Sequence, residues 1–288
     1  MLELETEKGT QQVASYHEYD VLQKVIVCSP EYMRIGKVIN ETQKHYQDEN
    51  IDEKRATEQH DQFVKAMQDN GIEVIAIKSQ EELHEQVFTR DIGFCIGDQL
   101  FTAAMGSDIR APEVDALQSV LKQHNFPFRP FTEKSIEGGD VIIDDDLVWV
   151  GISERTTYEA ADALQALLPS HKVMYLPIAE RILHLDCCFN VIGPKTALIY
   201  SPALTDDDLK KVSQYYDLIE VSKEEEFTLG TNVLCIGNKK IISLPENKQV
   251  NAELTRLGYQ VIEVEFNEII KSGGSFRCCS LPVLRTKE

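Results

Sequence analysis

The alternation of apolar and polar positions is clearest between residues 233 and 264. Two β-rich runs, VLCI and KIISL, flank a Gly237-Asn238 turn. A polar stretch with helical spacing of its apolar residues follows, and Gly258 separates it from a last apolar run, VIEV. Glycine commonly ends a helix, and short apolar runs around a Gly-Asn turn are typical of a hairpin. The segment therefore predicts the order strand, strand, helix, strand.

The same order recurs in residues 94–131, 141–176 and 188–221. Roughly equivalent positions in the four segments are Cys95, Ile142, Phe189 and Leu234, which are 47, 47 and 45 residues apart. An N-terminal unit contains VLQKVIVC, a helical stretch around DQFVKAMQDNG, and IEVIAI, and the strand-like C-terminal SFRCCSLPVLR is able to complete it. A period of about 20–50 residues is typical of stacked or radial repeats.

About five such units predict an α/β protein with radial repetition in one domain, residues 1–288. We expect loops at the mouth of its channel to carry the chemistry. An open α/β sheet is the alternative interpretation. It is less favoured because ordinary βαβ units lack the tight Gly-Asp and Gly-Asn hairpins of this chain.

The charge of the chain narrows the choice of partners. Lys and Arg number 29 against 48 Asp and Glu, which gives a net charge of −19. Such a charge repels nucleic acids and anionic lipids. No apolar run approaches the ~18 residues of a membrane-spanning helix. We therefore expect neither a nucleic-acid partner nor a membrane partner.

The N-terminal residues and the cysteines indicate where in the cell we expect the protein. The first residues, MLELETEKGT, lack the basic flank and apolar stretch of a secretory signal. The seven cysteines are odd in number and include the adjacent pairs Cys187-Cys188 and Cys278-Cys279, which suit a disulfide framework poorly. No CxxC pair exists, which argues against a zinc ribbon. These features predict a cytoplasmic protein.

Four segments at the edges of repeats contain candidate chemistry: TRDIGF (89–94), IEGGDV (136–141), HLDCCF (184–189) and SGGSFRCCSLP (272–282). Cys278 follows the pair Gly273-Gly274, whose backbone allows a tight turn and close approach of a ligand. A cysteine nucleophile needs a route to its thiolate and a partner for proton transfer. The alternative is that Cys278 is a buried strand residue, since free cysteine usually packs as a small hydrophobe.

His184 is the candidate for proton transfer, because imidazole titrates near neutral pH. In the pattern ILHLDCCF, we expect His184 and Asp186 to point to the same side of a strand. A satisfied, purely structural His–Asp pair remains the alternative. Asp91 and Glu137 join Asp186 as a candidate acidic pocket for a cation.

Three acids also fit a divalent metal, but such sites rarely include a cysteine and one histidine in this arrangement. EGGD has no downstream Lys-Ser/Thr, so a phosphate-binding loop is disfavoured. Arg110 and Arg155 are candidate carboxylate clamps. The alternative interpretation is that both arginines are ordinary surface residues.

In this order, TRD, EGGD, GISERT, HLD, TNVLCIG and GGSFRCCSLP resemble the guanidino-group-modifying enzymes, from about Tyr19 to Arg285. That superfamily includes arginine deiminases, dimethylarginine dimethylaminohydrolases, agmatine deiminases and amidinotransferases. The resemblance implies the pentein fold, a five-bladed propeller of ββαβ units around a narrow central channel. It also implies a single catalytic domain.

The resemblance assigns roles to the candidate residues. Cys278 matches the nucleophile, His184 the general acid/base and Glu137 its associated carboxylate. Asp91 and Asp186 match the positions that hold the guanidinium nitrogens. The implied reaction is attack of Cys278 on the guanidinium carbon, departure of an amine and hydrolysis of a covalent thiouronium. It requires no metal and no organic cofactor.

Arg155, in GISERT, resembles the residue that holds the α-carboxylate of an arginine-type substrate, and Arg110, in IRAPEV, resembles a second carboxylate-binding arginine. Both argue against agmatine. The expected partner is therefore a small guanidino compound, and a homo-oligomer is left open.

The resemblance is strongest to the compact dimethylarginine dimethylaminohydrolases, because 288 residues leave little room for the extra helical domain of arginine deiminases. Asp186 argues against the compact type, since that type commonly has Lys after HL. Arginine deiminase and amidinotransferase are therefore the alternatives among enzymes. A non-catalytic propeller that binds arginine-like ligands is the alternative from another class.

Overall fold

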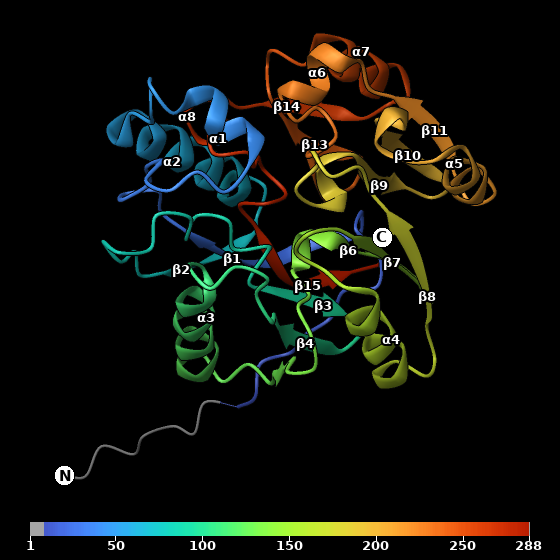
Figure 1. Ribbon diagram of the computed structural model, residues 1–288, viewed down its shortest axis with the longest axis horizontal. Coiled ribbons are helices and arrows are strands. Elements are labelled where there is room, and N and C mark those ends of the chain that lie inside the picture. The colour runs from blue at the N-terminus through green and yellow to red at the C-terminus, as the bar shows by residue number, and fades with distance from the viewer. Residues whose placement is uncertain (1–8, 288) are drawn as a thin grey trace.

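The computed structural model describes residues 9–287, and the strands within them form five three-stranded sheets. In every sheet the middle strand is antiparallel to one neighbour and parallel to the other. The sheets lie around the centre of the molecule, with helices toward the outside (Figure 1). Five separate sheets exclude the open sheet, and the five-unit α/β architecture predicted from the repeat is confirmed.

Four of the sheets each come from consecutive strands of one repeat. They consist of β3 (Gly93–Ile96), β4 (Gln99–Thr102) and β5 (Arg129–Pro130); β6 (Val141–Asp144), β7 (Leu147–Ile152) and β8 (Lys172–Pro177); β9 (Phe189–Gly193), β10 (Thr196–Ile199) and β11 (Asp217–Glu220); and β12 (Leu234–Gly237), β13 (Lys240–Ser243) and β14 (Gln260–Glu263).

The fifth sheet joins the two ends of the described chain. Its order is β15-β1-β2, built from β15 (Leu281–Thr286), β1 (Val21–Cys28) and β2 (Glu73–Ile77). β15 is antiparallel to β1, and Ile26 lies opposite Leu281. The prediction that the C-terminal strand completes the first unit is therefore confirmed. This closure fixes the segment just before β15, which contains Cys278.

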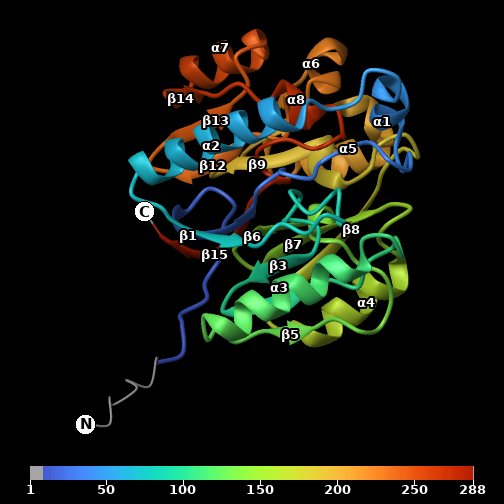
Figure 2. The ribbon, with the colours of Figure 1, turned by 90° about the vertical axis from the view of Figure 1, so that its left-hand side faces the viewer.

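One or two helices connect the two parallel strands of each unit, and two further short helices, residues 223–227 and 267–270, lie between units. They are α1 (Glu41–Tyr46), α2 (Glu53–Asp69), α3 (Ala111–Gln123), α4 (Tyr158–Leu167), α5 (Asp206–Ser213), α6 (Lys223–Phe227), α7 (Lys248–Arg256) and α8 (Asn267–Ile270). Capping side chains start several of them. Thr157, for example, accepts a hydrogen bond from the amide of Ala160 at the start of α4. In the turned view, α3 and α4 lie on one side and α6 and α7 on the opposite side (Figure 2).

The hairpin turns need left-handed backbone. Asp145, Lys195 and Asn238 have φ of 57°, 56° and 51°. At Gly237 (φ 87°) an added Cβ would lie 2.3 Å from the Cα of Val21. Glycine is therefore required there both by conformation and by the close approach of the first sheet to the last.

The first strands of the repeats lie in the core. Every residue of β3, β9 and β12 is buried. Polar side chains beside these strands form hydrogen bonds with one another. Trp149 Nε1 donates to the hydroxyl of Tyr216 (2.9 Å), which donates to Asp144 (2.9 Å). These contacts join the sheet β6-β7-β8 to Tyr216, the residue that precedes β11.

A buried ion network connects several units. Arg277 donates through Nη1 to Oδ2 of Asp186 (2.6 Å) and through Nη2 to Oε1 of Glu18 and the carbonyl of Val141 (both 3.0 Å). Burial opposes ionisation of Glu18, but the positive charges of Arg277 and two other arginines lower the pKa of Glu18 to about 2. Glu18 therefore carries its negative charge beside Arg277.

No helix within residues 9–287 is long and apolar enough to span a membrane. The expectation about a secretory signal concerns mainly residues 1–8, which lie outside the described part of the chain.

The closing strand gives a prediction about stability. Leu281 is fully buried, so Leu281→Ala leaves a cavity, and we expect the free energy of unfolding to fall by about 2–5 kcal/mol. The control Ile109→Ala removes a side chain that is 47% exposed and should change it by less than about 0.5 kcal/mol. Urea denaturation followed by circular dichroism measures both. Equal losses in the two variants would contradict the role assigned to β15.

Candidate active site

The four sequence motifs meet because each precedes the first strand of a unit or the closing strand. Asp91 comes just before β3 and Cys278 just before β15, while Glu137 and His184 each precede a short 3-10 helix, η1 (Gly138–Asp140) or η2 (Leu185–Cys187). These four side chains line one pocket, together with Arg110 and Arg155. Asp186 is the one sequence-predicted site residue that does not line this pocket.

His184 is held between two carboxylates. Its Nε2 lies 2.8 Å from Oε2 of Glu137, and its Nδ1 lies 3.5 Å from Oδ1 of Asp91. Burial opposes the charged imidazole, but Asp91, the hydrogen bond to Glu137 and the nearby Asp140 raise the pKa of His184 well above its usual value. The resting pair is therefore an imidazolium beside a carboxylate.

The expectation that His184 and Asp186 share one face of a strand is wrong. His184 is the extended residue (φ −138°, ψ 161°) that precedes η2, and Asp186 lies within that 3-10 helix. The turn sends the two side chains to different partners. Asp140 fixes its start, because Oδ1 of Asp140 accepts a hydrogen bond from the amide of Leu185 (2.8 Å).

Glu137 is completely buried and has partners for both oxygens. Oε1 accepts from the amide of Gly106 (2.9 Å), and Oε2 faces His184. Burial raises the pKa of such a group, but the hydrogen bond and the charge of His184 outweigh it, so the pKa of Glu137 is lowered. Glu137 therefore remains a carboxylate that orients His184 and stabilises its charge.

Asp91 offers one uncommitted oxygen. Its Oδ2 pairs with Arg110 (2.6 Å), whereas its buried Oδ1 has no hydrogen-bond partner among the described residues. Burial is the main cause of the raised pKa of Asp91. Such an orphaned oxygen in a pocket suits an N–H donor on a ligand. Gly139 makes room for it, because an added Cβ would lie 2.8 Å from Oδ1 and from the ring of His184.

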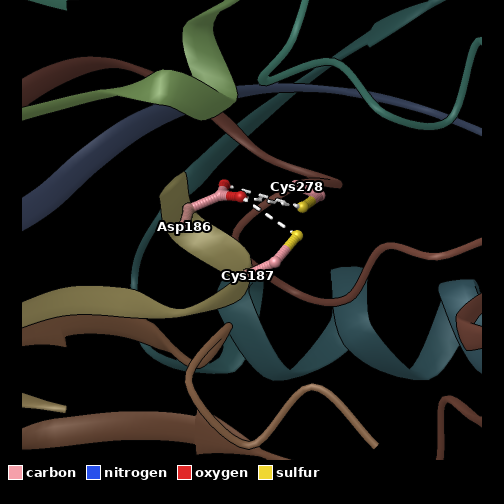
Figure 3. Close-up of side chains that lie close together, drawn as sticks. All are labelled: Asp186, Cys187 and Cys278. Carbon is pink, nitrogen blue, oxygen red and sulfur yellow. Dashed lines mark hydrogen bonds between the residues drawn. The ribbon is translucent and has the colours of Figure 1, made fainter. Parts of the chain in front are cut away.

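Cys278 has two polar neighbours. Asn232 donates through Nδ2 to the sulfur (3.1 Å) and accepts from the amide of Cys278 through Oδ1 (3.1 Å). Both carboxylate oxygens of Asp186 lie 3.6 Å from the same sulfur, and Figure 3 shows them facing it. Asp186 is itself held by Arg277. A buried thiol, an amide donor and a carboxylate are thus brought together.

Sequence reasoning missed Asn232, Arg277 and Cys187 as residues around Cys278. Asn232 lies in TNVLCIG, and Arg277 directly precedes Cys278, so the motifs contained both. Their contacts join positions that are 46 and 91 residues apart, which no spacing rule in the sequence specifies.

Arg110 and Arg155 differ in how many of their N–H donors already have partners. Arg110 is bound to Asp91, to Glu113 (2.8 Å) and to the carbonyl of Phe88 (3.2 Å), so it mainly orients Asp91. Arg155 donates through Nη2 to the carbonyl of Ile39 (3.1 Å) and lies 4.0 Å from Glu137. Arg155 therefore has more donor capacity left for a ligand.

Comparison with known proteins decides the family. The family described as "N,N dimethylarginine dimethylhydrolase, eukaryotic" matches residues 29–285, nearly the whole chain. The chain belongs to this family. The resemblance found in the sequence is thereby confirmed, and the family supports chemistry at a guanidino group, by hydrolysis or by transfer.

Similar proteins agree with this family. The chain is 50% identical to the uncharacterized protein YkgA of Bacillus subtilis, over 93% of this chain and 94% of that protein. It is 26% identical to the dimethylarginine dimethylaminohydrolase of Pseudomonas aeruginosa, over 79% and 88% of the two chains. The N-terminal domain of ArgZ, an arginine dihydrolase from Cyanobacteria, has the same fold, with a TM-score of 0.84, 22% identity and coverage of 92% and 98%.

Two groups of side chains in the described part have the composition of metal ligands. One is Asp91, Glu137 and His184, and the other is Asp186, Cys187 and Cys278. In the first group His184 already binds Glu137, and Asp91 binds Arg110. Atoms of both residues that could bind a metal are therefore already engaged with protein partners.

The pocket is closed at its outer end by Glu85 and its partners. Glu85 accepts hydrogen bonds from Gln43 (2.8 Å) and Ser272 (3.0 Å), and Asn40 donates to the carbonyl of Ser272 (2.9 Å). The cavity left inside is about 10 Å³, room for roughly one water molecule. This space is too small for an amino acid, so binding of one requires the lining side chains to move.

Glu85 gives a prediction about pH and stability. Burial raises the pKa of Glu85 to about 7 from its ordinary 4.5. The folded state therefore binds the proton more tightly than the unfolded state, and stability is lost as the pH rises from about 4.5 through about 7. Glu85→Gln should remove up to about 3 kcal/mol of this loss. Urea midpoints between about pH 5 and pH 8 measure it.

The matched control is Glu82→Gln, an exposed neighbour. We expect it to keep the pH slope of the native protein. The same slope in Glu85→Gln as in the native protein would show that Glu85 does not hold a proton in the folded state.

Proposed function

We propose that the protein hydrolyses the guanidinium C–N bond of an arginine-type substrate, with Cys278 as the nucleophile. The products are citrulline or a similar ureido compound and an amine or ammonia. The observation that carries this proposal is the pocket in which the buried Cys278 thiol, the His184–Glu137 pair and the free oxygen of Asp91 meet. Membership of the family and the relative from Pseudomonas aeruginosa support it.

Binding of the guanidinium relies on carboxylates. A planar guanidinium donates paired N–H groups, which a carboxylate accepts as charge-assisted hydrogen bonds. Oδ1 of Asp91 has no hydrogen-bond partner among the described residues, and both oxygens of Asp186 lie 3.6 Å from the sulfur of Cys278. The two acids hold the flat cation in place and turn its central carbon toward Cys278. The positive charge of the substrate favours the thiolate.

The chemical steps then need only one proton carrier. The thiolate of Cys278 forms a C–S bond with the guanidinium carbon, and His184 gives its proton to the departing amine as the C–N bond breaks. Neutral His184 next takes a proton from water, and the hydroxide adds to the carbon of the thiouronium. Breakage of the C–S bond returns Cys278 and releases the ureido product.

This proton transfer contributes about 10²–10⁴-fold to the rate. Glu137 serves it by holding the imidazole through a 2.8 Å contact. Asn232 donates to the sulfur and so supports its negative charge. Positioning by Asp91 and Asp186 supplies the remaining acceleration.

We assign the other end of the substrate to Arg155 and Glu85, which line the same pocket. An α-carboxylate suits the donors of Arg155, and a positively charged α-amino group favours the carboxylate form of Glu85. The substrate is thus an amino acid with a guanidino side chain, and agmatine is disfavoured. The reaction in this proposal takes place in the cytoplasm and uses no metal.

Arginine deiminase is the second candidate function. Asp186 beside Cys278 favours it, because a carboxylate at this place accepts hydrogen bonds from an unmethylated guanidinium nitrogen. Methyl groups on that nitrogen remove the donors. Whether the preferred substrate is methylated or free arginine therefore depends on the hydrogen bonds that its guanidinium nitrogen makes with Asp186.

The decisive experiment is a ureido-product assay with arginine, monomethylarginine, dimethylarginine, agmatine and several ω-guanidino acids. We expect turnover with at least one amino acid, loss of all turnover in Cys278→Ser and retention in the adjacent buried control Cys279→Ser. Product from methylated substrates alone supports the dimethylarginine reaction, and product from arginine supports the deiminase. Full activity of Cys278→Ser would overturn the covalent mechanism.

If no substrate in that panel gives a product, two additional tests are needed. Product that forms only when an amino acid is added as an amine acceptor would replace hydrolysis by amidino transfer. A thiol at Cys278 that reacts with a haloacetamidine no faster than free cysteine would replace the enzyme by a binding protein.

Asp186 is tested with Asp186→Asn. A lysine at this position would place two cations together, because Arg277 lies 2.6 Å from the carboxylate, whereas asparagine keeps an acceptor for Arg277. Loss of a charged hydrogen bond should lower kcat/KM for the preferred guanidine by roughly 10- to 100-fold. Measurements on arginine and dimethylarginine in parallel show whether the preference shifts. Unchanged values for both would remove Asp186 from the substrate site.

A further inference from the structure

Asp140 is a completely buried carboxylate to which the proposed reaction assigns no role. It ends η1, three residues after Glu137. Its Oδ1 accepts a hydrogen bond from the amide of Leu185 (2.8 Å), and its Oδ2 accepts one from the hydroxyl of Ser153 (2.8 Å). The amide of Leu185 belongs to the peptide bond that follows His184. Asp140 thus joins the backbone beside His184 to the turn that follows β7.

Ser153 extends this contact to the turn that contains Arg155. Its Oγ accepts hydrogen bonds from the amides of Arg155 (3.0 Å) and Thr156 (3.2 Å) and donates its proton to Asp140. A serine hydroxyl has one proton and two lone pairs, so every bonding position of Ser153 is occupied. Full satisfaction of a polar network makes its geometry rigid.

Thr156 leads from this turn back to Glu137. The amide of Glu137 donates to the hydroxyl oxygen of the completely buried Thr156 (3.1 Å), and a hydrogen bond from Thr156 favours the carboxylate form of Asp140. The three residues Asp140, Ser153 and Thr156, here called the Asp140 network, therefore bind backbone at or beside His184, Arg155 and Glu137.

The backbone of β7 is packed directly against this network. At Gly151 an added Cβ would lie 2.5 Å from Oδ1 of Asp140 and 2.7 Å from Cβ of Leu185. Any side chain at this position would push the carboxylate away from the amide that it binds. The close approach therefore requires glycine.

Asp140 also influences the charge of the imidazole. Burial raises the pKa of Asp140 to about 6, although the charge of His184 and several hydrogen bonds oppose this rise. At neutral pH Asp140 is therefore mainly a carboxylate. Together with Asp91 and Glu137, it raises the pKa of His184.

We propose that Asp140 and Ser153 are positioning residues that hold His184 and Arg155 in one fixed arrangement, and that Asp140 keeps His184 protonated. Neither side chain lines the substrate pocket. The positioning role rests on the proposed function, because it needs His184 as the acid and Arg155 as the carboxylate-binding residue. The effect of Asp140 on the charge of His184 does not rest on it.

The first test is kinetic and uses Ser153. Ser153→Ala removes the hydroxyl that joins Asp140 to the turn, and kcat for the preferred guanidine should fall roughly 10- to 100-fold, since a displacement of about 1 Å has an effect of that size. Ser153→Thr keeps the hydroxyl and should restore most of the activity. The matched control Ser119→Ala removes an exposed hydroxyl that donates to a carbonyl within α3, and should keep kcat.

The second test is the pH profile of Asp140→Asn. Asparagine keeps an acceptor for the amide of Leu185 but lacks the charge. The alkaline limb of kcat should move to lower pH, because His184 then loses its proton more easily. The matched control Asp208→Asn replaces another buried carboxylate that accepts from a hydroxyl, that of Thr205 (2.7 Å), and should leave the limb in place. A limb that stays in place in Asp140→Asn as well would show that Asp140 has a structural role alone.

A measurement without substrate separates this proposal from the proposed function. Nuclear magnetic resonance of protein labelled with ¹⁵N-histidine follows the titration of His184, whose signal is identified by its absence in His184→Gln. We expect the midpoint to be lower in Asp140→Asn than in the native protein. A lower midpoint in a protein that converts no guanidine would support the role of Asp140 in charge and count against the hydrolase.

The opposite result would overturn the proposal and leave the hydrolase intact: turnover of a guanidine by the native protein, with equal His184 midpoints in the native protein and Asp140→Asn. If Asp140→Asn does not fold, the two Ser153 variants decide. Equal kcat in Ser153→Ala and Ser153→Thr would then overturn the positioning role.

Discussion

Arg277 brings a positive charge into a part of the molecule that water does not reach, and partners from several repeats compensate for it. Glu18 precedes β1, Val141 begins β6, and Asp186 precedes β9. A buried ion pair adds little net stability, but loss of one partner leaves an uncompensated charge. The network therefore acts mainly by allowing one relative arrangement of these repeats. Because Cys278 is the next residue, that arrangement also fixes the position of Cys278.

The electrostatics of the pocket follow from burial of several acids around one histidine. Burial favours the neutral form of each acid, yet His184 gains a proton from the combined field of Asp91 and Glu137, and its charge in turn lowers the pKa of Glu137. Asp91 keeps a raised pKa, and its Oδ1 has no hydrogen-bond partner among the described residues, with Nδ1 of His184 at 3.5 Å. An arriving guanidinium adds the positive charge that these acids lack. A cationic substrate thus completes the charge balance of the site rather than disturbing it.

The sequence predicts the repeat well because a ββαβ unit is specified locally. Apolar runs, Gly-Asn and Gly-Asp turns and capping threonines each act over a few residues, and the period makes them recur. Convergence of Asp91, Glu137, His184 and Cys278 then follows from the position of each motif before a strand. What the sequence does not specify depends on distant partners. The contact of Asn232 with Cys278 is one example.

The local geometry of HLDCCF is the part of the site that the sequence predicts wrongly. Alternation of apolar and polar residues predicts a strand, but a strand needs a neighbour along its whole length, and the chain pairs only from Phe189 onward. Before that point Asp140 accepts the amide of Leu185 and stabilises a 3-10 turn instead. The turn separates Asp186 from His184 and places it beside the sulfur of Cys278.

That displacement has a chemical consequence. A carboxylate beside a buried sulfur opposes the negative charge of a thiolate, whereas the amide of Asn232 donates to the sulfur and Arg277 offsets the charge of Asp186. In the proposed function, the arriving guanidinium supplies the additional positive charge that the thiolate needs. The substrate itself therefore favours the ionised form of its nucleophile.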